Sequence, residues 1–282
     1  MMSNDHQGIS FQILSCRISI SYDDPRLRST LDYIAVEAVQ DVTITKTLSY
    51  TVAGTGPYEI REENDFLDRV GSADDVLFRI YRRVYRRVLD RYVLAGWVVL
   101  HAGAVKVNGS RLAILGDKGA GKTTLMTRLM CAGHQLEGDE LLLARGDQLL
   151  AVPRRLHLKP DIESNVPQLA GQLDDLPVTR AGDTKIRALD PVLHGFDWQI
   201  SVGAVDHWIW LSPNHGGNTR LDKMTSFIMM QRMLESYLGW GESRRQVVNC
   251  VAGLATKGGF RLLLGNADEA AMQLQTLAAR GH

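Results

Sequence analysis

The sequence predicts an α/β fold in which a small β-rich N-terminal domain precedes a larger core of alternating strands and helices. Short runs rich in Thr, Ile, Val and Tyr occupy residues 8–60 between turn residues. From Ser72 to Tyr92, apolar residues recur with the helical period. A glycine-rich segment at 116–123 then separates an apolar run from a second helical pattern, as in α/β cores.

The composition excludes several classes of protein. The 282 residues include 32 basic and 32 acidic side chains and are 45% hydrophobic, which is typical of a folded chain and not of a disordered one. The formal net charge of +0 gives no general affinity for nucleic acid or for an anionic membrane. The longest apolar stretch, 93–105, has about 13 residues, fewer than the roughly 20 needed to span a bilayer.

Cysteine usage and the N-terminal segment favour a cytoplasmic location. Cys16, Cys131 and Cys250 are far apart and form no CxxC pair, so we expect reduced thiols and neither a disulfide framework nor a zinc site. Residues 1–10 contain no basic segment followed by an apolar one, so no signal peptide is expected.

The N-terminal domain is expected to span residues 1–70, and a connecting helix to span 71–96. The expected strands cover residues 9–13, 16–22 and 42–52. The helix should begin near Ser72, whose spacing from Asp75 resembles a capping box. Its polar face carries six arginines, at positions 79, 82, 83, 86, 87 and 91. This face either lies in solvent with its side-chain stems over apolar neighbours or meets an acidic peptide or phosphate.

The remaining residues, 97–282, are expected to form the core domain. The expected strands cover 97–107, 111–115, 135–137, 141–144, 148–152, 207–211 and 260–264. The expected helices cover 122–132, 224–238 and a last helix to 279, with Asn266 and Asp268 as caps. Residues 160–204 are rich in Pro, Gly and Asp, and a long irregular stretch of this kind is more typical of a lid or a binding loop than of filler.

The glycine-rich segment matches the phosphate-loop motif GxxxxGK(S/T) at every position. It reads Gly116-Asp117-Lys118-Gly119-Ala120-Gly121-Lys122-Thr123. Backbone N–H groups of such a loop and the positive end of the following helix bind phosphate oxygens. Lys122 then reaches the β- and γ-phosphates, and the Thr123 hydroxyl joins a Mg²⁺ shell made mostly of water and phosphate oxygens. The alternative is a glycine-rich turn with a surface lysine.

Two carboxylates follow one helix and one short strand after this loop. A β-α-β arrangement returns Asp139 and Glu140 to the sheet edge that holds Thr123. The preceding run, 134–138, is more polar than the usual Walker B strand. The chain also lacks an Asn-Lys-x-Asp segment, which disfavours a GTPase switch.

The spacing of these residues resembles the kinase domain of HPr kinase/phosphorylase and of shorter HPr-kinase-like proteins. The resemblance covers residues 97–152: His101 before the hairpin, the phosphate loop, and Gly-His-Gln-Leu-Glu-Gly-Asp-Glu at 133–140. It implies a P-loop kinase core related to phosphoenolpyruvate carboxykinase, and transfer of the ATP γ-phosphate to a serine of a protein or peptide. By the same resemblance Asp139 is the general base, Glu140 binds Mg²⁺, and His101 contacts phosphate or orients Asp139. Without it, His101 is better explained as a satisfied core histidine.

The chain departs from the family at several positions. Lys118 and Thr124 replace a Ser and a Glu of the family's loop, and the Glu-Ile-Arg-Gly-Leu-Gly segment that follows Val152 in the family is absent. The missing segment puts the reverse phosphorylase reaction in doubt. Arg155 and Lys159, in the run that replaces it, either supply charge to phosphate or belong to a solvated basic strand.

The layout is most similar to the short relatives that accompany lasso peptide precursors. The expected function is an ATP- and Mg²⁺-dependent serine kinase that acts on a peptide or small protein, with nucleotide contacts from residues 116–124. A homo-oligomer is possible, because relatives are often hexameric. The alternatives are an HPr-type kinase of carbohydrate regulation, a small-molecule kinase, and a nucleotide-gated binding module that hydrolyses ATP only incidentally.

Overall fold

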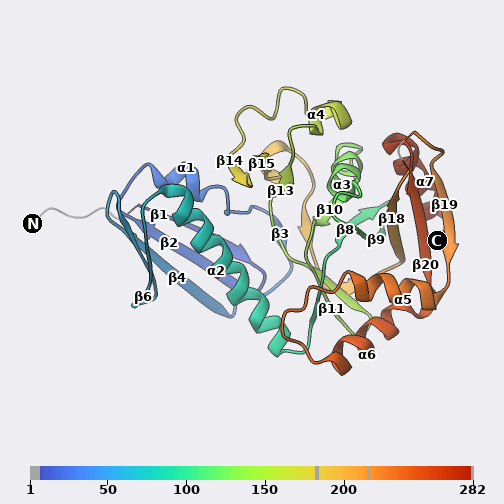
Figure 1. The fold of residues 1–282 in the computed structure, drawn as a ribbon, viewed down its shortest axis with the longest axis horizontal. Coiled ribbons are helices and arrows are strands. Elements are labelled where there is room, and N and C mark those ends of the chain that lie inside the picture. Colours follow the sequence, from blue (N-terminus) through green and yellow to red (C-terminus); the bar gives the residue numbers. More distant parts are fainter. Residues whose placement is uncertain (1–6, 182–183, 215, 281–282) are drawn as a thin grey trace, which may run out of the picture.

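The computed structural model describes residues 7–181, 184–214 and 216–280. Two predicted segments fall partly outside the described residues. Residues 1–6 of the segment 1–10, for which no signal peptide is expected, lie outside them. Residues 182–183 of the segment 160–204 do so as well. The chain is a mixed α/β protein with several sheets, and the N-terminal sheet lies at the opposite end of the molecule from α7 (Figure 1).

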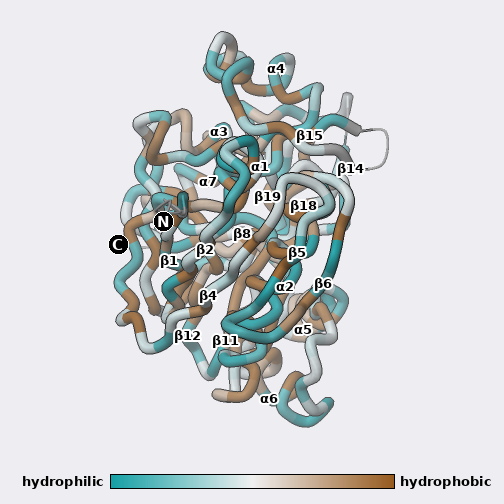
Figure 2. Tube along the Cα trace, turned by 90° about the vertical axis from the view of Figure 1, so that its left-hand side faces the viewer, coloured by the Kyte–Doolittle hydropathy of each residue, from teal (hydrophilic) through white to brown (hydrophobic). Residues whose placement is uncertain are grey.

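The N-terminal part forms a five-stranded sheet with the order β1-β2-β4-β5-β6. Its strands are β1 (Gln7–Ile13), β2 (Cys16–Tyr22), β4 (Lys46–Ala53), β5 (Tyr58–Glu62) and β6 (Asp65–Val70). The first three expected strands are confirmed, although the third begins four residues later than predicted. Seen from the side of this sheet, its strands lie in front of the core (Figure 2). The last two strands were not predicted, because charged residues dominate their exposed positions.

The long helix α2 (Ala73–Leu94) covers this sheet together with the short α1 (Leu27–Leu31). The predicted start is confirmed, since the Ser72 side chain accepts a hydrogen bond from the backbone N–H of Asp75. The apolar stripe of α2 is buried, including Ile80, Val84 and Val88 at 0% exposure. The helix therefore packs on the N-terminal sheet as well as connecting it to the core.

Half of the arginines on α2 are paired with the sheet instead of lying free in solvent. Arg79 is 2.8 Å from a carboxylate oxygen of Asp68. Glu62, which is 8% exposed, accepts from Arg83 at 2.5 Å and from Arg87 at 2.8 Å. Burial raises the pKa of Glu62, but the hydrogen bonds from Arg87 and Arg83 outweigh it and lower that pKa to about 2.

We expect Glu62→Gln to destabilise the protein by about 2 kcal/mol at neutral pH, since two guanidinium groups lose their carboxylate. The folded-state pKa is depressed, so this stabilisation is present above the unfolded pKa near 4.5 and is lost as the pH falls toward 2. Urea unfolding at a series of pH values measures both effects. The matched control is Glu63→Gln, because the Glu63 side chain is 59% exposed and its ion pair with Lys46 is on the surface. Equal unfolding curves for the two variants would contradict the expectation.

The core contains a six-stranded sheet with the order β10-β8-β9-β18-β20-β19. These strands are β8 (Gly103–Val107), β9 (Ser110–Gly116), β10 (Gln135–Gly138), β18 (His207–Pro213), β19 (Arg220–Met224) and β20 (Gly259–Leu264). Strands β9, β18 and β20 are parallel. Helices α3 (Lys122–Cys131) and α7 (Ala267–Ala279) pack together at one side of the sheet, and α5 (Ser226–Glu235) packs with α6 (Arg244–Leu254) at the other (Figure 1).

The prediction of one continuous strand over 97–107 is wrong. The chain forms β7 (Val98–Leu100) in a separate four-stranded sheet and then β8 in the central sheet. The four-stranded sheet has the order β17-β12-β11-β7. Its other strands are β11 (Leu142–Arg145), β12 (Gln148–Ala151) and β17 (Gly203–Ala204). At the switch, the backbone N–H of His101 leaves both sheets and donates to Ser236 at 2.7 Å. Both strands are apolar, so composition gives no sign of the change.

The segment 160–204 is more regular than expected. It contains α4 (Ile162–Asn165), the hairpin of β14 (Val178–Ala181) with β15 (Thr184–Leu189), and β16 (Gln199–Ile200). β15 also pairs with β13 (Leu156–Leu158), and β16 pairs with β3 (Val39–Gln40). The 3-10 turns Pro167–Leu169, Val192–His194 and Ala255–Lys257 complete the regular structure of the core. The predicted helix over 224–238 is shorter, and α6 was not predicted.

Two expectations about the whole chain can be compared with the described residues. Within them, no helix combines the length and the apolar character that crossing a membrane requires. Cys16, Cys131 and Cys250 are free, as predicted.

Candidate functional site

The glycine-rich loop joins β9 to α3, which confirms the strand-loop-helix context of the motif. Two of its glycines have a positive φ and lie close to neighbouring strands. A Cβ at Gly116, where φ is 155°, would lie 2.8 Å from the carbonyl oxygen of Leu211. A Cβ at Gly121, where φ is 95°, would lie 2.9 Å from Leu264. Packing against β18 and β20 therefore fixes the path of the loop.

The helix that follows the loop begins without a side-chain cap. Its N-cap is Gly121, which has no side chain to accept from the first-turn N–H groups. Side chains cap the other described helices of ten or more residues: Ser72 for α2, Thr225 for α5, Ser243 for α6 and Asn266 for α7. The uncapped donors and the positive end of the α3 dipole favour an anion at this point.

Lys122 lies under the loop instead of extending into solvent. It is 6% exposed, and its Nζ donates to the carbonyl oxygens of Gly116 at 2.6 Å and Asp117 at 3.2 Å. Burial lowers the pKa of Lys122, whereas the carboxylates of Asp139 and Asp117 raise it. A polyphosphate in the loop would give this buried ammonium group a stronger partner than the two carbonyls.

The other loop residues differ in exposure. Asp117, Lys118 and Gly119 are exposed at the tip of the loop. Ala120 is 1% exposed, and Thr124 in the first turn of α3 is half-buried.

Asp139 is next to Thr123, as the order of elements predicts. The Thr123 hydroxyl donates to Asp139 Oδ2 at 2.7 Å. Asp139 is 3% exposed, and its second oxygen, Oδ1, is buried with no hydrogen-bond partner among the described residues. Burial raises the pKa of Asp139, and the hydrogen bond from Thr123 and the charges of Arg154 and Lys122 oppose this shift. A buried carboxylate oxygen without a partner is a feature that a proton or a cation would satisfy.

His101 and Glu140 complete the wall of the site beside Asp139. His101 Nδ1 lies 3.2 Å from the backbone carbonyl oxygen of Glu140. Burial lowers the pKa of His101, and the charge of Lys122 lowers it further, which favours the neutral ring. Glu140 has a positive φ of 73°, and its carboxylate forms an ion pair with Arg154. The structure thus brings His101, Thr123, Asp139 and Glu140 together.

Of the two basic residues predicted after Val152, Arg155 contacts the N-terminal part of the chain and not this cluster. Arg155 is 7% exposed, and its Nε donates to the carbonyl oxygen of Ala35 at 2.6 Å. The same Nε lies 3.9 Å from a carboxylate oxygen of Asp190. Lys159 is exposed beyond the end of β13. Arg155 therefore links the core to the N-terminal part of the chain.

Arg154 is a second basic residue at the site, and no sequence motif predicted it. It pairs with Glu140, contacts His157, and lies 5.5 Å from the centre of the Tyr81 ring on α2. Neighbouring residues of an extended run point to opposite faces, so the prediction of Arg155 chose the face that meets Ala35 and left out Arg154 on the other face.

The donors at the site fit Mg²⁺ only together with a nucleotide. The described residues contain no group of three or more His, Cys, Asp or Glu side chains arranged to hold a metal ion. The Thr123 hydroxyl and the Glu140 carboxylate, which pairs with Arg154, are hard oxygen donors, and Mg²⁺ keeps most of its shell as water and phosphate oxygens. The arrangement therefore suits an ion that arrives with its phosphates.

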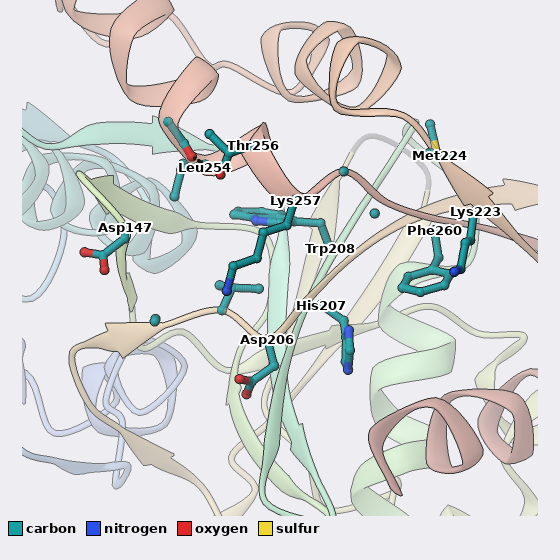
Figure 3. Close-up of a pocket in the computed structure, with 15 residues that line it drawn as sticks. Asp147, Asp206, His207, Trp208, Lys223, Met224, Leu254, Thr256, Lys257 and Phe260 are labelled. Carbon is teal, nitrogen blue, oxygen red and sulfur yellow. Dashed lines mark hydrogen bonds between the residues drawn. The ribbon is translucent and has the colours of Figure 1, made fainter. Parts of the chain in front are cut away.

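A second cavity, of about 480 Å³, lies at the other end of the parallel strands (Figure 3). In β18, Leu211 pairs with Gly116 of the loop, whereas His207 pairs with Leu112 four residues earlier. His207 lines this cavity, and Lys257 extends toward Asp206 within it. The phosphate loop is thus at the carboxyl edge of the sheet, where ligands of α/β proteins bind, and this cavity is at the opposite edge.

Comparisons with known proteins give a distant structural likeness. No protein-family model matches the sequence, and no curated protein matches it. Among solved structures, the HPr(Ser) kinase/phosphatase from Coxiella burnetii is similar, with 15% sequence identity and a TM-score of 0.33 over 64% of this chain and 94% of that chain.

Proposed function

We propose that this protein is an ATP- and Mg²⁺-dependent kinase that transfers the γ-phosphate to a serine hydroxyl of a peptide or small protein. The observation that carries the proposal is the 2.7 Å hydrogen bond between Thr123 and Asp139 at the start of α3. It joins the two halves of a phosphotransfer site, because Thr123 belongs to the phosphate loop and Asp139 is a carboxylate with one unpartnered oxygen.

The loop supplies the nucleotide-binding half of the proposed site. Backbone N–H groups of 116–124 surround the phosphates, and Lys122 leaves its two carbonyl partners to contact the β- and γ-phosphates. Thr123 and Glu140 would hold Mg²⁺, Glu140 directly or through water. When bound, Mg²⁺ neutralises charge on the phosphate oxygens.

The carboxylate supplies the transfer half. The serine oxygen attacks the γ-phosphorus in line, the bond from that phosphorus to the β,γ-bridging oxygen breaks, and ADP leaves. The serine proton passes to Asp139, whose raised pKa suits a proton acceptor. His101, neutral and held against Glu140, fixes the wall beside Asp139.

The proposed acceptor is a serine of a ribosomally made precursor peptide of the lasso type. The support is the resemblance over 97–152 and the small β-rich N-terminal part, both read from the sequence. An HPr-like small protein uses the same chemistry and is the alternative acceptor within this class.

The test uses the full chain with ATP labelled at the γ-phosphate, Mg²⁺, and two acceptor pools: serine peptides with candidate precursors, and a small-metabolite extract. We expect label on serine of a peptide, located by mass spectrometry, and no transfer when EDTA removes Mg²⁺. Label in a metabolite alone would identify a small-molecule kinase. ATP binding with slow hydrolysis and no labelled acceptor would instead favour a binding module.

A further inference from the structure

A pocket of about 440 Å³ lies between α2 and residues 238–240. Arginines and aromatic rings dominate its lining: Arg82, Arg86, Arg154, Tyr81, Tyr85 and Trp240. None of the residues that line it in the described part of the chain carries a carboxylate. The pocket therefore presents positive charge over an aromatic floor.

This pocket adjoins the candidate transfer site. Leu141 lines it, and the Leu141 backbone N–H donates to the carbonyl oxygen of Asp139 at 3.1 Å. Arg154 lines it as well, and its guanidinium pairs with Glu140. The charge of Arg154 also acts on the pKa values of Asp139 and His101. A chain bound in the pocket thus lies within reach of the proposed base.

The charges on the α2 side of the pocket are weakly paired. Arg82 lies over the exposed ring of Phe78, with 5.2 Å to the ring centre. Arg86 is 3.7 Å from Asp90, with the two side chains 67% and 40% exposed, so this pair contributes little. Asp90 also accepts a hydrogen bond from the indole N–H of Trp240 at 3.0 Å. Both guanidinium groups are open to an incoming carboxylate.

We propose that this pocket binds an acidic segment of the acceptor peptide and so directs the neighbouring serine to the phosphate loop; the inference rests on the proposed kinase function. Arg82 and Arg86 attract the carboxylates, and the rings of Tyr81 and Trp240 pack against the peptide stems and any aromatic residue. A peptide suits the pocket better than a nucleic acid, because the cavity is small and the formal net charge of the chain is +0.

The test measures binding without requiring transfer. The probes are two short fluorescein-labelled peptides, each with one serine, flanked by glutamates in one peptide and by lysines in the other. Fluorescence anisotropy follows their binding to the wild-type chain, to the double variant Arg82→Glu with Arg86→Glu, and to a control with Arg17→Glu and Arg69→Glu. The control makes the same charge change at exposed positions of the N-terminal sheet. Thermal unfolding verifies that all three proteins are folded.

We expect the wild type and the control to bind the glutamate peptide. The Arg82→Glu, Arg86→Glu variant should bind it about tenfold or more weakly. Added salt should weaken binding to the wild type. ATP affinity should be the same in all three. No binding of the glutamate peptide, equal binding by the pocket variant, a preference for the lysine peptide, or displacement of the peptide by a short oligonucleotide would each overturn the proposal. If the peptide binds through the pocket but no phosphate is transferred, the kinase function is refuted and the pocket proposal stands. If phosphate is transferred equally by the wild type and the Arg82→Glu, Arg86→Glu variant, the pocket proposal is refuted and the kinase function stands.

Discussion

Replacement of Lys122 by alanine is expected to reduce the affinity for ATP at least about 100-fold, or roughly 3 kcal/mol. Lys122 is the basic side chain of the loop that is buried, and its Nζ already lies within hydrogen-bond distance of two loop carbonyls. Without it, the β- and γ-phosphates would rely on the loop N–H groups and Mg²⁺. Isothermal titration calorimetry with a non-hydrolysable ATP analogue measures the loss.

A matched variant separates this effect from a general loss of positive charge. Lys223→Ala removes an exposed lysine from β19, beside the cavity at the opposite edge of the sheet. Its affinity for the analogue should equal that of the wild type. Unchanged affinity in Lys122→Ala, with an intact thermal transition, would remove the loop from the nucleotide site and with it the basis of the proposed function.

Asp139→Asn is expected to keep nucleotide binding within a few-fold and to reduce phosphate transfer about a thousandfold. An amide oxygen still accepts the hydrogen bond from Thr123, but it cannot take the proton of the attacking serine. Because burial raises the pKa of Asp139, a neutral side chain there should not destabilise the fold. Single-turnover transfer from labelled ATP measures the rate, and calorimetry measures binding.

The control for this experiment is Asp147→Asn, in the exposed turn between β11 and β12. The two changes are chemically identical, so only the position of the carboxylate distinguishes them. Transfer by Asp139→Asn at the wild-type rate would rule out this residue as the base. A rate restored by raising the Mg²⁺ concentration would instead assign Asp139 to metal binding.

Local signals in the sequence predicted the elements around the loop well. The motif at 116–123 requires a strand before it and a helix after it, and both are present. The spacing from Thr123 to Asp139 allows one helix and one short strand, and these bring the two side chains into contact. Chain connectivity alone was sufficient for this prediction, because few paths return a strand to the same sheet edge.

Features that depend on long-range packing were not predicted. The apolar run around His101 divides between two sheets where its backbone contacts Ser236 on the distant 224–238 segment. The choice between Arg154 and Arg155 depends on which face of their extended run meets α2 and which meets Ala35. Strand β5 was not predicted because three of its five residues are charged. Its buried positions alternate with more exposed ones, and α2 packs against this strand.

The division of arginines along α2 has an evolutionary consequence. Positions 79, 83 and 87 repeat every four residues and pair with the N-terminal sheet, whereas positions 82 and 86 form the neighbouring row, which borders the pocket. The row 79, 83 and 87 stabilises the fold, whereas 82 and 86 form no ion pair with the N-terminal sheet. Mutation can therefore retune which partners the helix attracts without eroding stability, so related chains should diverge at 82 and 86 sooner than at 83 and 87.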